Sequence, residues 1–432
     1  MLVLKENLEK RSATIAIVGM GYVGIPLLLR YSKLGYKTIG VDVDDAKVTQ
    51  LNEGSSPIGH IPSSKIKSVL SKHSFFTSEF NKISDADAII LCVPTPLTKN
   101  RSPDMSYISD CMEMLMPHLR KGQVLSLEST TYPGTTEEYC VIPISGIRKY
   151  EIGKDFFVVY SPEREDPGNM SYTTSTIPKV VAGHTERCLE IGIALYGNAI
   201  EKLVPVSSLR TAEMTKLLEN IHRSVNIGLV NEMKIVADKM QIDIYEVIRA
   251  AATKPFGFIP YYPGPGLGGH CIPVDPFYLT WKAKEFGLQT KFIEIAGEVN
   301  SAMPSWVVGK ITGALNSIKK SVNTSRILIL GVAYKKNVGD VRESPAIEII
   351  NELLELGAHI SFCDSNVKNI TTDTGQVLSS KALLSEAISS SDLVCIATAH
   401  DDVDYQALLN SGVLIVDTRG VYSSNHTNVI KA

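Results

Sequence analysis

The chain has 432 residues, of which 21% are charged and 44% are hydrophobic, and its formal net charge at pH 7 is -3. A chain of this length exceeds a single hydrophobic core, so two or three domains are expected. The nearly balanced charge gives no electrostatic basis for binding nucleic acid or an anionic membrane surface, and no apolar run reaches the length of a membrane span.

Cysteine usage and the N-terminus indicate a reducing compartment. The seven cysteines are scattered without a C-x-x-C pair, so the sequence predicts neither a disulfide framework nor a metal site. The stretch 1–11 is short and charged and lacks the apolar core of a signal peptide. A cytoplasmic protein with free thiols is therefore expected.

The first predicted element is a buried strand at 14–18, which leads into a Gly-x-Gly-x-x-Gly turn and then a helix. A second strand at 37–43 carries Asp42, 18 residues after the last glycine of the turn. A dinucleotide site needs this setting, because the helix N-terminus binds the pyrophosphate and the acid binds the ribose hydroxyls. No arginine directly follows Asp42, which favours NAD over NADP. The predicted cofactor contacts in this segment are Gly19, Gly21, Tyr22, Val23, Gly24 and Asp42.

Apolar strands continue to alternate with helical segments up to residue 206, as in a doubly wound parallel sheet. Ligands of such sheets bind beyond the carboxyl ends of the strands. Three strands, at 88–93, 123–130 and 156–160, end in segments rich in proline, serine and threonine. These residue types are common in any turn, but their occurrence at three strand ends favours a cofactor crevice. The segments are 94–96, 129–134 and 161–168, and a further strand is predicted at 179–183.

A long helix is predicted from Thr211 to Met240, where apolar residues recur at helical spacing. Helices of this length commonly bridge domains or pack against a partner chain. Lys216 and Asn220 stand one turn apart on this helix, so both side chains point the same way. A lysine among apolar neighbours usually keeps its charge at the surface, so the residue type alone predicts an exposed Lys216.

The stretch 263–276 joins a run rich in glycine and proline to Cys271, with Asp275 four residues later. Glycines permit sharp turns and close approach of the backbone to a ligand. A cysteine in this position can act as a nucleophile once its thiol loses its proton, and Asp275 would share its helix face. A lone cysteine beside a glycine turn is otherwise commonly a buried small residue.

A second α/β unit is predicted from about residue 323 onwards. Its first turn has a single glycine, so it is not a second dinucleotide motif. The loop 334–344 carries two lysines and an arginine at a strand end, which suits either a phosphate-bearing ligand or a solvated surface. The predicted elements are strands at 326–333, 359–364, 392–397 and 413–417 and a helix at 344–356.

The expected fold is α/β, with two Rossmann-like doubly wound parallel-sheet domains joined by a central helical domain that contains a long helix. The expected boundaries are 1–206 for the NAD-binding domain, 207–305 for the central domain and 306–432 for the C-terminal domain.

Seven motifs, in order along nearly the whole chain, resemble those of the UDP-glucose/GDP-mannose dehydrogenase family. Within that family the chain is most similar to the UDP-N-acetylhexosamine 6-dehydrogenases of bacterial polysaccharide synthesis, on the evidence of His270, Val274 and the segment 56–62. The stretch 253–258 lacks the arginine that UDP-glucose enzymes tend to carry there, which disfavours UDP-glucose. The motifs lie at 19–24, 94–96, 129–136, 161–164, 213–220, 268–275 and 333–344.

The resemblance implies a four-electron oxidation of the C6 alcohol of a UDP-sugar to a carboxylate, with two NAD used in turn. Cys271 would capture the aldehyde and carry a thioester, which a water activated by Glu163 or Asp275 would hydrolyse. Lys216, or a water held by the same two carboxylates, would take the first proton. The implied catalytic residues are Cys271, Lys216, Asn220, Asp275, Glu163 and Thr130, with Lys216 and Asn220 as oxyanion donors and Thr130 orienting the water.

The resemblance also implies the binding residues and the assembly. The C-terminal domain would bind the UDP-sugar, and the long helix suggests a homodimer or a dimer of dimers. Further cofactor contacts would be Pro94, Thr95, Thr130 and Arg419. The implied substrate contacts are Glu163, Arg164, Lys216, Asn220, Lys254, Phe258, Gly266, Gly268, Tyr334, Lys335 and Arg342.

Several alternatives remain open at this point. UDP-N-acetylglucosamine is the preferred substrate, for polysaccharide, capsule or O-antigen precursors, and UDP-N-acetylmannosamine, UDP-glucose and GDP-mannose are the other candidates. A different class of function would be an NAD-binding sensor or scaffold without turnover. A two-step β-hydroxyacid dehydrogenase would share the first domain and the long helix but would not need the Cys271 loop.

Overall fold

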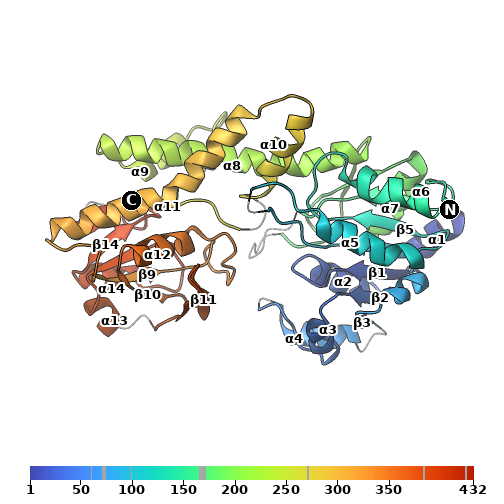
Figure 1. Ribbon diagram of the computed structural model, residues 1–432, viewed down its shortest axis with the longest axis horizontal. Coiled ribbons are helices and arrows are strands. Elements are labelled where there is room, and N and C mark those ends of the chain that lie inside the picture. The colour runs from blue at the N-terminus through green and yellow to red at the C-terminus, as the bar shows by residue number, and fades with distance from the viewer. Residues whose placement is uncertain are drawn as a thin grey trace. The chain divides into compact units, whose positions relative to one another are not determined.

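A computed structural model describes residues 1–59, 61–70, 74–98, 100–164, 172–269, 272–382, 385–423 and 426–432. The chain divides into two compact units, one of Met1–Glu219 with Phe277–Leu288 and one of Asn220–Pro276 with Gln289–Ala432. Each unit is described by itself below (Figure 1). No helix within the described ranges is long and apolar enough to cross a membrane.

The first unit is built on an eight-stranded sheet whose first six strands are all parallel. Its strand order, 3-2-1-4-5-6, is that of a dinucleotide-binding fold. The strands are almost entirely buried, as expected of a sheet covered on both faces. In spatial order they are β3 (Phe75–Thr77), β2 (Lys37–Val41), β1 (Thr14–Val18), β4 (Ala88–Leu91), β5 (Val124–Leu127), β6 (Phe157–Tyr160), β7 (Lys179–Gly183) and β8 (Leu203–Pro205).

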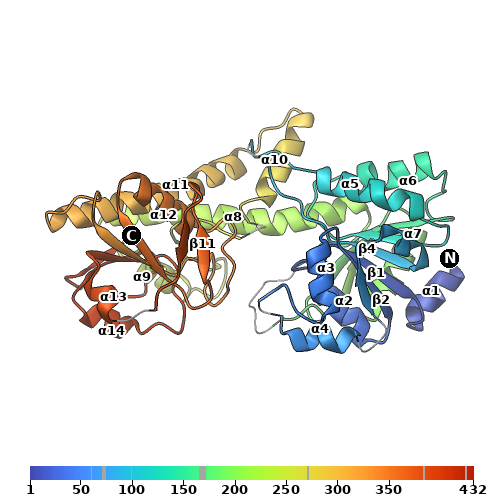
Figure 2. The ribbon, with the colours of Figure 1, turned by 60° about the horizontal axis from the view of Figure 1, so that its bottom comes forward.

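Helices cover both faces of this sheet (Figure 2). Residues of α1, α2 and α7 share one buried cluster with Ile15 and Ile17 of β1, and α5 and α6 lie on the opposite face. Tyr31 of α2 donates a hydrogen bond to the Leu195 carbonyl of α7, 3.0 Å away. The helices are α1 (Leu2–Glu9), α2 (Gly24–Lys33), α3 (Asp45–Asn52), α4 (Ser63–Leu70), α5 (Ser106–Leu115), α6 (Ile142–Ile147) and α7 (Glu186–Gly197), with short 3-10 turns at Phe80–Asp85 and Met116–His118 and a π-turn at Glu137–Val141.

Strand β7 runs against the direction of the other strands. It pairs antiparallel with β6, with Tyr160 opposite Ala182, and then parallel with β8. An antiparallel neighbour needs no crossover helix. As a consequence, the amino end of β7, at Lys179, lies at the sheet edge where β6 has its carboxyl end.

Four helices carry the chain between the two sheets. The predicted long helix is confirmed as α8 (Leu209–Lys239), which the unit boundary crosses after Glu219. The others are α9 (Ile244–Ala251), α10 (Asp275–Glu285) and α11 (Lys291–Ser317). Asp243 caps α9 by accepting hydrogen bonds from the Tyr245 and Glu246 amides, which explains where that helix begins.

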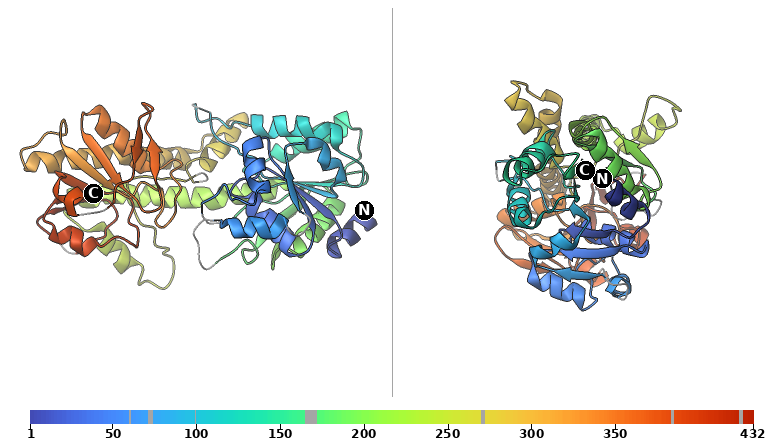
Figure 3. Two further views of the ribbon diagram at one scale, coloured as in Figure 1. Left: turned by 90° about the horizontal axis from the view of Figure 1, so that it is seen from below. Right: turned by 90° about the vertical axis from the view of Figure 1, so that its right-hand side faces the viewer.

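The second unit contains a parallel sheet with helices packed against it (Figure 3). This sheet has five strands in the order 10-9-13-14-15. This is the other common doubly wound order, in which the first strand lies second from the edge. Helices α11 and α12 share a core with one face of the sheet, and α13 and α14 share a core with the other. The strands are β9 (Arg326–Leu330), β10 (His359–Cys363), β13 (Leu393–Ile396), β14 (Leu414–Asp417) and β15 (Val429–Lys431), with a hairpin of β11 (Asn369–Thr371) and β12 (Val377–Ser379). The helices are α12 (Pro345–Glu355), α13 (Ser385–Ser389) and α14 (Tyr405–Asn410).

The expected fold class is confirmed, with two doubly wound sheets and a long helix between them in sequence. The three domain boundaries stay a prediction. The short strands β3, β8, β11, β12 and β15 and the reversal of β7 were not expected from the sequence.

Candidate functional site

The turn after β1 has three glycines, and a side chain at each of these positions would meet different surroundings. Gly19 has φ +96°, and a Cβ there would lie 2.5 Å from the Cys92 carbonyl oxygen. A Cβ at Gly24 would lie 1.9 Å from the Gly19 oxygen, so this glycine lets the helix start pack on the turn. A Cβ at Gly21 would meet nothing within 4 Å. The open space at Gly21 is therefore room for a ligand, as a pyrophosphate on this turn requires.

The start of α2 is suited to bind an anion. Its N-cap residue, Val23, makes no side-chain capping hydrogen bond, and the first turn of the helix has no acidic residue. Unpaired amide groups at a helix N-terminus attract a negative charge. The predicted contacts Tyr22 and Val23 stand at this position, with Tyr22 39% exposed.

Asp42 follows β2 and is buried at the edge of the sheet. Its carboxylate accepts hydrogen bonds from the Met20 amide at 2.8 Å and the Asp44 amide at 3.1 Å. Lys47 is 2.9 Å from the same carboxylate. The amide bonds fix the acid beside the glycine turn, where the predicted ribose contact has to lie.

The carboxyl ends of β4 and β5 bring the predicted residues of these segments to the same sheet edge. Thr95 and Thr130 are both buried, and the Ser129 hydroxyl donates to the Val93 carbonyl at 2.7 Å. The next residue, Thr131, has a buried hydroxyl with no hydrogen-bond partner among the residues that the structure describes. A buried hydroxyl without a partner carries a desolvation cost that a ligand or water can remove. We therefore add Thr131 to the candidate residues.

Glu163 and Arg164 follow β6. The Glu163 side chain is 13% exposed, and one of its carboxylate oxygens accepts the Arg164 amide at 2.7 Å. The Arg164 guanidinium binds Glu219 of α8 through two nitrogens, at 3.1 and 2.6 Å. Arg164 is therefore an anchor between this loop and α8, a contact that its predicted role in substrate binding did not anticipate.

Helix α8 carries two buried lysines, and they differ in their surroundings. Lys234, which the sequence did not single out, donates to the Thr418 carbonyl at 3.1 Å, and its burial, together with Arg419, lowers its pKa to about 7. Lys216 is only 6% exposed, so the expectation of a surface lysine was wrong. Its ammonium group makes no hydrogen bond or ion pair within the described part of the chain. A buried lysine side chain without a protein partner is suited to donate to a substrate oxygen.

In the second unit, Asn220 and Asp275 are brought together. The Asn220 amide nitrogen donates to the Asp275 carboxylate at 2.5 Å, and Asp275 is fully buried at the start of α10. This contact links α8 to the segment that follows the glycine run. Cys271 and His270 lie outside the described residues, as does His60 of the segment 56–62.

The glycine run is packed against the loop that follows β9. A Cβ at Gly268 would lie 2.6 Å from the Tyr334 Cβ, and one at Gly264 would lie 2.6 Å from an Arg419 nitrogen. The Gly269 amide also donates to the Arg342 carbonyl at 3.0 Å. The glycines are thus needed for close backbone contact. Several predicted site residues cluster here, namely the substrate residues Gly266, Gly268, Tyr334 and Arg342 and the cofactor residue Arg419.

Two further contacts hold the glycine run in place. Asn231 of α8 is fully buried, and its side-chain oxygen accepts the Gly264 amide at 3.0 Å. The Tyr245 hydroxyl donates to the Pro263 carbonyl at 3.2 Å. By contrast, Lys254 and Phe258 lie on an exposed segment, and their role stays a prediction.

The loop that carries Lys335 is fixed by a buried pair. His400 lies 3.0 Å from the Asp364 carboxylate through Nε2, and its Nδ1 accepts the Asn337 amide at 2.9 Å. Burial opposes ionisation of Asp364, but the hydrogen bonds from His400 and backbone amides outweigh it and hold its pKa below the ordinary value. Arg342 pairs with Asp340 of the same loop at 2.7 Å.

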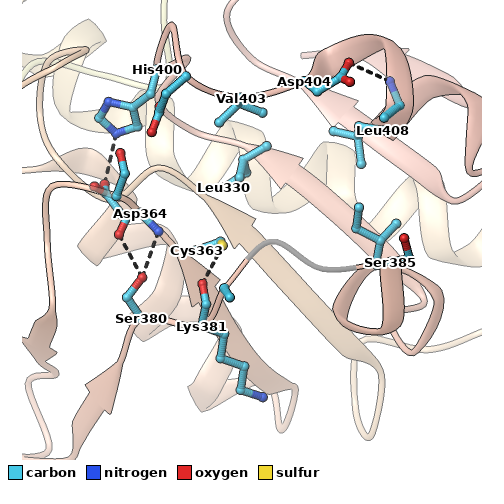
Figure 4. A pocket seen from close by; sticks show the side chains of 15 residues that line it. Leu330, Cys363, Asp364, Ser380, Lys381, Ser385, His400, Val403, Asp404 and Leu408 are labelled. Carbon is cyan, nitrogen blue, oxygen red and sulfur yellow. Dashed lines mark hydrogen bonds and ion pairs between the residues drawn. The ribbon is translucent and has the colours of Figure 1, made fainter.

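The His400–Asp364 pair forms one end of a cavity of about 550 Å³ at the carboxyl ends of β9 and β10 (Figure 4). Figure 4 shows the imidazole ring pointing toward the carboxylate. Leu330, Val403 and Leu408 line the apolar part of the cavity. No local pattern predicts this cavity, because its lining comes from four separate segments of the chain.

Three family models match the chain in succession. They are the NAD binding domain of the UDP-glucose/GDP-mannose dehydrogenase family at residues 13–200, the central domain of that family at 210–302 and its UDP binding domain at 328–424.

Individual proteins match over most of their length. Protein CapL of Staphylococcus aureus is 34% identical, over 96% of this chain and 97% of its own. A UDP-N-acetyl-D-glucosamine 6-dehydrogenase of Pseudomonas aeruginosa is 34% identical, over 81% of this chain and 82% of its own. The solved structure of a UDP-D-ManNAc dehydrogenase from Pyrococcus horikoshii has a TM-score of 0.87 and 28% identity, covering 97% of this chain and 98% of its own.

The glycine turn generates a paired prediction. Gly21→Ala should leave the midpoint of thermal unfolding unchanged but weaken NAD binding at least tenfold, because its Cβ meets no protein atom and enters the ligand space. Gly24→Ala should lower the midpoint, since its Cβ would overlap the Gly19 oxygen and overpacking costs about 1–3 kcal/mol. Calorimetry of both variants with and without NAD measures the two effects. Wild-type NAD affinity in Gly21→Ala would contradict the assignment of this turn.

Proposed function

The chain belongs to the UDP-glucose/GDP-mannose dehydrogenase family, and we propose from this premise that it oxidises the C6 alcohol of a UDP-N-acetylhexosamine to a carboxylate with NAD as the acceptor. The observation that carries the proposal is the buried side chain of Lys216, in the unit that also holds the dinucleotide turn and Glu163.

The first candidate substrate is UDP-N-acetylglucosamine. It is supported by the His270, Val274 and 56–62 sequence features and by the 34% identity to the Pseudomonas aeruginosa enzyme that acts on this sugar. UDP-N-acetylmannosamine is the second candidate, because a UDP-D-ManNAc dehydrogenase matches the fold over nearly the whole chain. UDP-glucose is disfavoured by the absence of an arginine in 253–258.

In the first oxidation, a base has to take the C6 hydroxyl proton while NAD, when bound, accepts a hydride. Lys216 is the proposed base, because its side chain is buried in the same unit as the dinucleotide turn. A water held by Glu163 and Asp275 is the alternative base. Asn220, held by Asp275, would donate to the developing oxyanion together with Lys216.

The second half of the reaction needs a covalent intermediate. The Cys271 thiolate would add to the aldehyde carbon and give a thiohemiacetal oxyanion. This oxyanion would become a thioester when the carbon gives up its hydride, for which a second NAD, when bound, would be the acceptor. Water then adds to the thioester carbon, and the products are the carboxylate and the free thiol. Glu163 or Asp275 would take the water proton, with Thr130 or its neighbour Thr131 orienting the water.

The UDP part of the substrate is proposed to bind in the second unit. Lys335, in the loop that His400 anchors, would face the diphosphate, and Arg342 is the second cation of the loop. Tyr334 packs closely against the glycine run and would form one side of this proposed binding site. Lys254 and Phe258 remain proposed contacts of the sugar or uracil.

A panel of nucleotide sugars tests this proposal. We expect two NADH per molecule of UDP-N-acetylglucosamine consumed, with a uronic acid as product, when absorbance is followed for UDP-GlcNAc, UDP-ManNAc, UDP-glucose, UDP-GalNAc and GDP-mannose. Faster turnover of UDP-ManNAc would establish the second candidate. No NADH with any sugar would reject the proposal and leave the NAD-binding scaffold standing.

We propose a homodimer as the assembly, on the basis of an exposed apolar stripe on α8. Leu229, Met233 and Val236 of α8, and Met240 directly after it, recur at helical spacing and are 57%, 45%, 45% and 63% exposed. A continuous apolar stripe of this kind is best covered by the same stripe of a second copy.

The stripe gives a direct test of the assembly. Leu229→Asp with Met233→Asp should shift the molar mass measured by light scattering from dimer to monomer, because two carboxylates would be buried in the interface. Val377→Asp changes an apolar residue that is 62% exposed on a hairpin and serves as the control. A wild-type chain that is monomeric at micromolar concentration would refute the proposed dimer.

A further inference from the structure

A buried charge cluster lies at the sheet edge beside Glu163, and no part of the proposed mechanism uses it. Its centre is Lys179, the first residue of β7, which is only 6% exposed. The antiparallel direction of β7 is the reason for its position, because it brings the amino end of this strand next to the carboxyl end of β6. A parallel β7 would place Lys179 at the opposite edge of the sheet.

The Lys179 ammonium contacts both the loop after β6 and the loop after β5. It is 2.8 Å from the Glu128 carboxylate and 3.9 Å from the Glu163 carboxylate. It also donates to the Pro162 carbonyl at 3.4 Å, directly before Glu163. One buried cation therefore serves two carboxylates and the backbone between them.

Glu128 is the member of the cluster that is held most firmly. It is 1% exposed, and its second oxygen accepts the Tyr196 hydroxyl at 2.6 Å. Tyr196 is in turn hydrogen-bonded to Ser126 of β5 at 2.8 Å, and its ring lies 5.2 Å from the Lys179 ammonium. Glu128 is therefore too deeply buried to contact a substrate.

The charges of the cluster act on one another. Burial alone would lower the Lys179 pKa, but Glu128 and Glu163 outweigh it and raise that pKa, with a smaller contribution from Cys92. Burial raises the Glu128 pKa, and the charge of Glu163 raises it further. Two more charged groups in the described part of the chain lie beside Glu163: Arg164, whose amide donates to the Glu163 carboxylate, and Glu219 of α8, which is paired with Arg164.

We propose that Lys179 is a positioning residue for Glu163, whose carboxylate it holds in place, and that Glu128 is the internal counter-charge that keeps Lys179 in place. This inference rests on the proposed function, in which Glu163 accepts a proton from water during thioester hydrolysis. Glu128 also competes with Glu163 for the same ammonium group, because both carboxylates face it. A change at either Glu128 or Lys179 therefore changes the electrostatic field at the Glu163 carboxylate.

The competition predicts shifts of opposite sign in two variants. Glu128→Gln leaves the whole Lys179 charge to Glu163, so the acidic limb of kcat against pH should move to lower pH. Glu128→Gln combined with Lys179→Met removes the cation while keeping the interior neutral, so the limb should move to higher pH, by roughly one unit. Lys179→Arg keeps a cation beside Glu163 and should retain the wild-type midpoint.

NMR titration of the Glu163 side-chain carboxyl carbon measures the midpoint of Glu163 ionisation in each variant without turnover. The signal is assigned with the Glu163→Gln variant. Shifts of opposite sign in both measurements support the positioning role. If NADH forms and both variants keep the wild-type midpoint, Lys179 only packs the sheet edge and the inference is wrong. If the NMR midpoints shift but no sugar yields NADH, the charge cluster stands and the proposed function is wrong.

The proposal can still be tested if the double variant does not fold. Glu128→Gln conserves volume and keeps an acceptor for Tyr196, so it tests the sign of the shift even if the double variant is unstable. An upward shift, or no shift, in folded Glu128→Gln overturns the proposal by itself.

Discussion

The architecture depends on one constraint, which is that the amide groups of the turn after the first strand of each parallel sheet need an acceptor. In both sheets this acceptor is an aspartate at the end of the second strand. Asp42 accepts the Met20 amide, and Asp364 accepts the Val332 and Ala333 amides. The aspartate ties the first two strand ends together and so defines the edge where ligands of a doubly wound sheet bind.

The two sheets then use this edge differently. In the first sheet the glycine turn leaves open space at Gly21, and the uncapped start of α2 is free for the pyrophosphate of NAD. In the second sheet the carboxylate of Asp364 is occupied by His400, whose other ring nitrogen holds the Lys335 loop. The same arrangement of strand and acid thus gives a cofactor site in one unit and an anchored basic loop in the other, which is where we propose the UDP group binds.

Much of this could be predicted from the sequence, because the signals are local. The turn glycines, Asp42 and the long helix each follow from spacing within about 30 residues, and all were confirmed as structural features. The direction of β7 could not be predicted, since an apolar strand has the same pattern whether it is parallel or antiparallel. Its consequence, the Lys179–Glu128 pair, joins residues 51 apart in sequence. The buried Lys216 and Lys234 were likewise hidden, because burial of a lysine depends on what packs around it and not on its own segment.

The central claim is that Cys271 holds the sugar covalently, as a thiohemiacetal between the two oxidations and as a thioester after the second. It is tested most directly by acid quenching of the Glu163→Gln enzyme after mixing with NAD and the sugar that turns over, followed by mass spectrometry of the Cys271 peptide. The account predicts that this peptide gains the mass of the uronyl adduct, since hydrolysis is slowed, and that Cys271→Ser gains none. A Cys271→Ser enzyme that still produces two NADH per sugar at the wild-type rate would contradict the account.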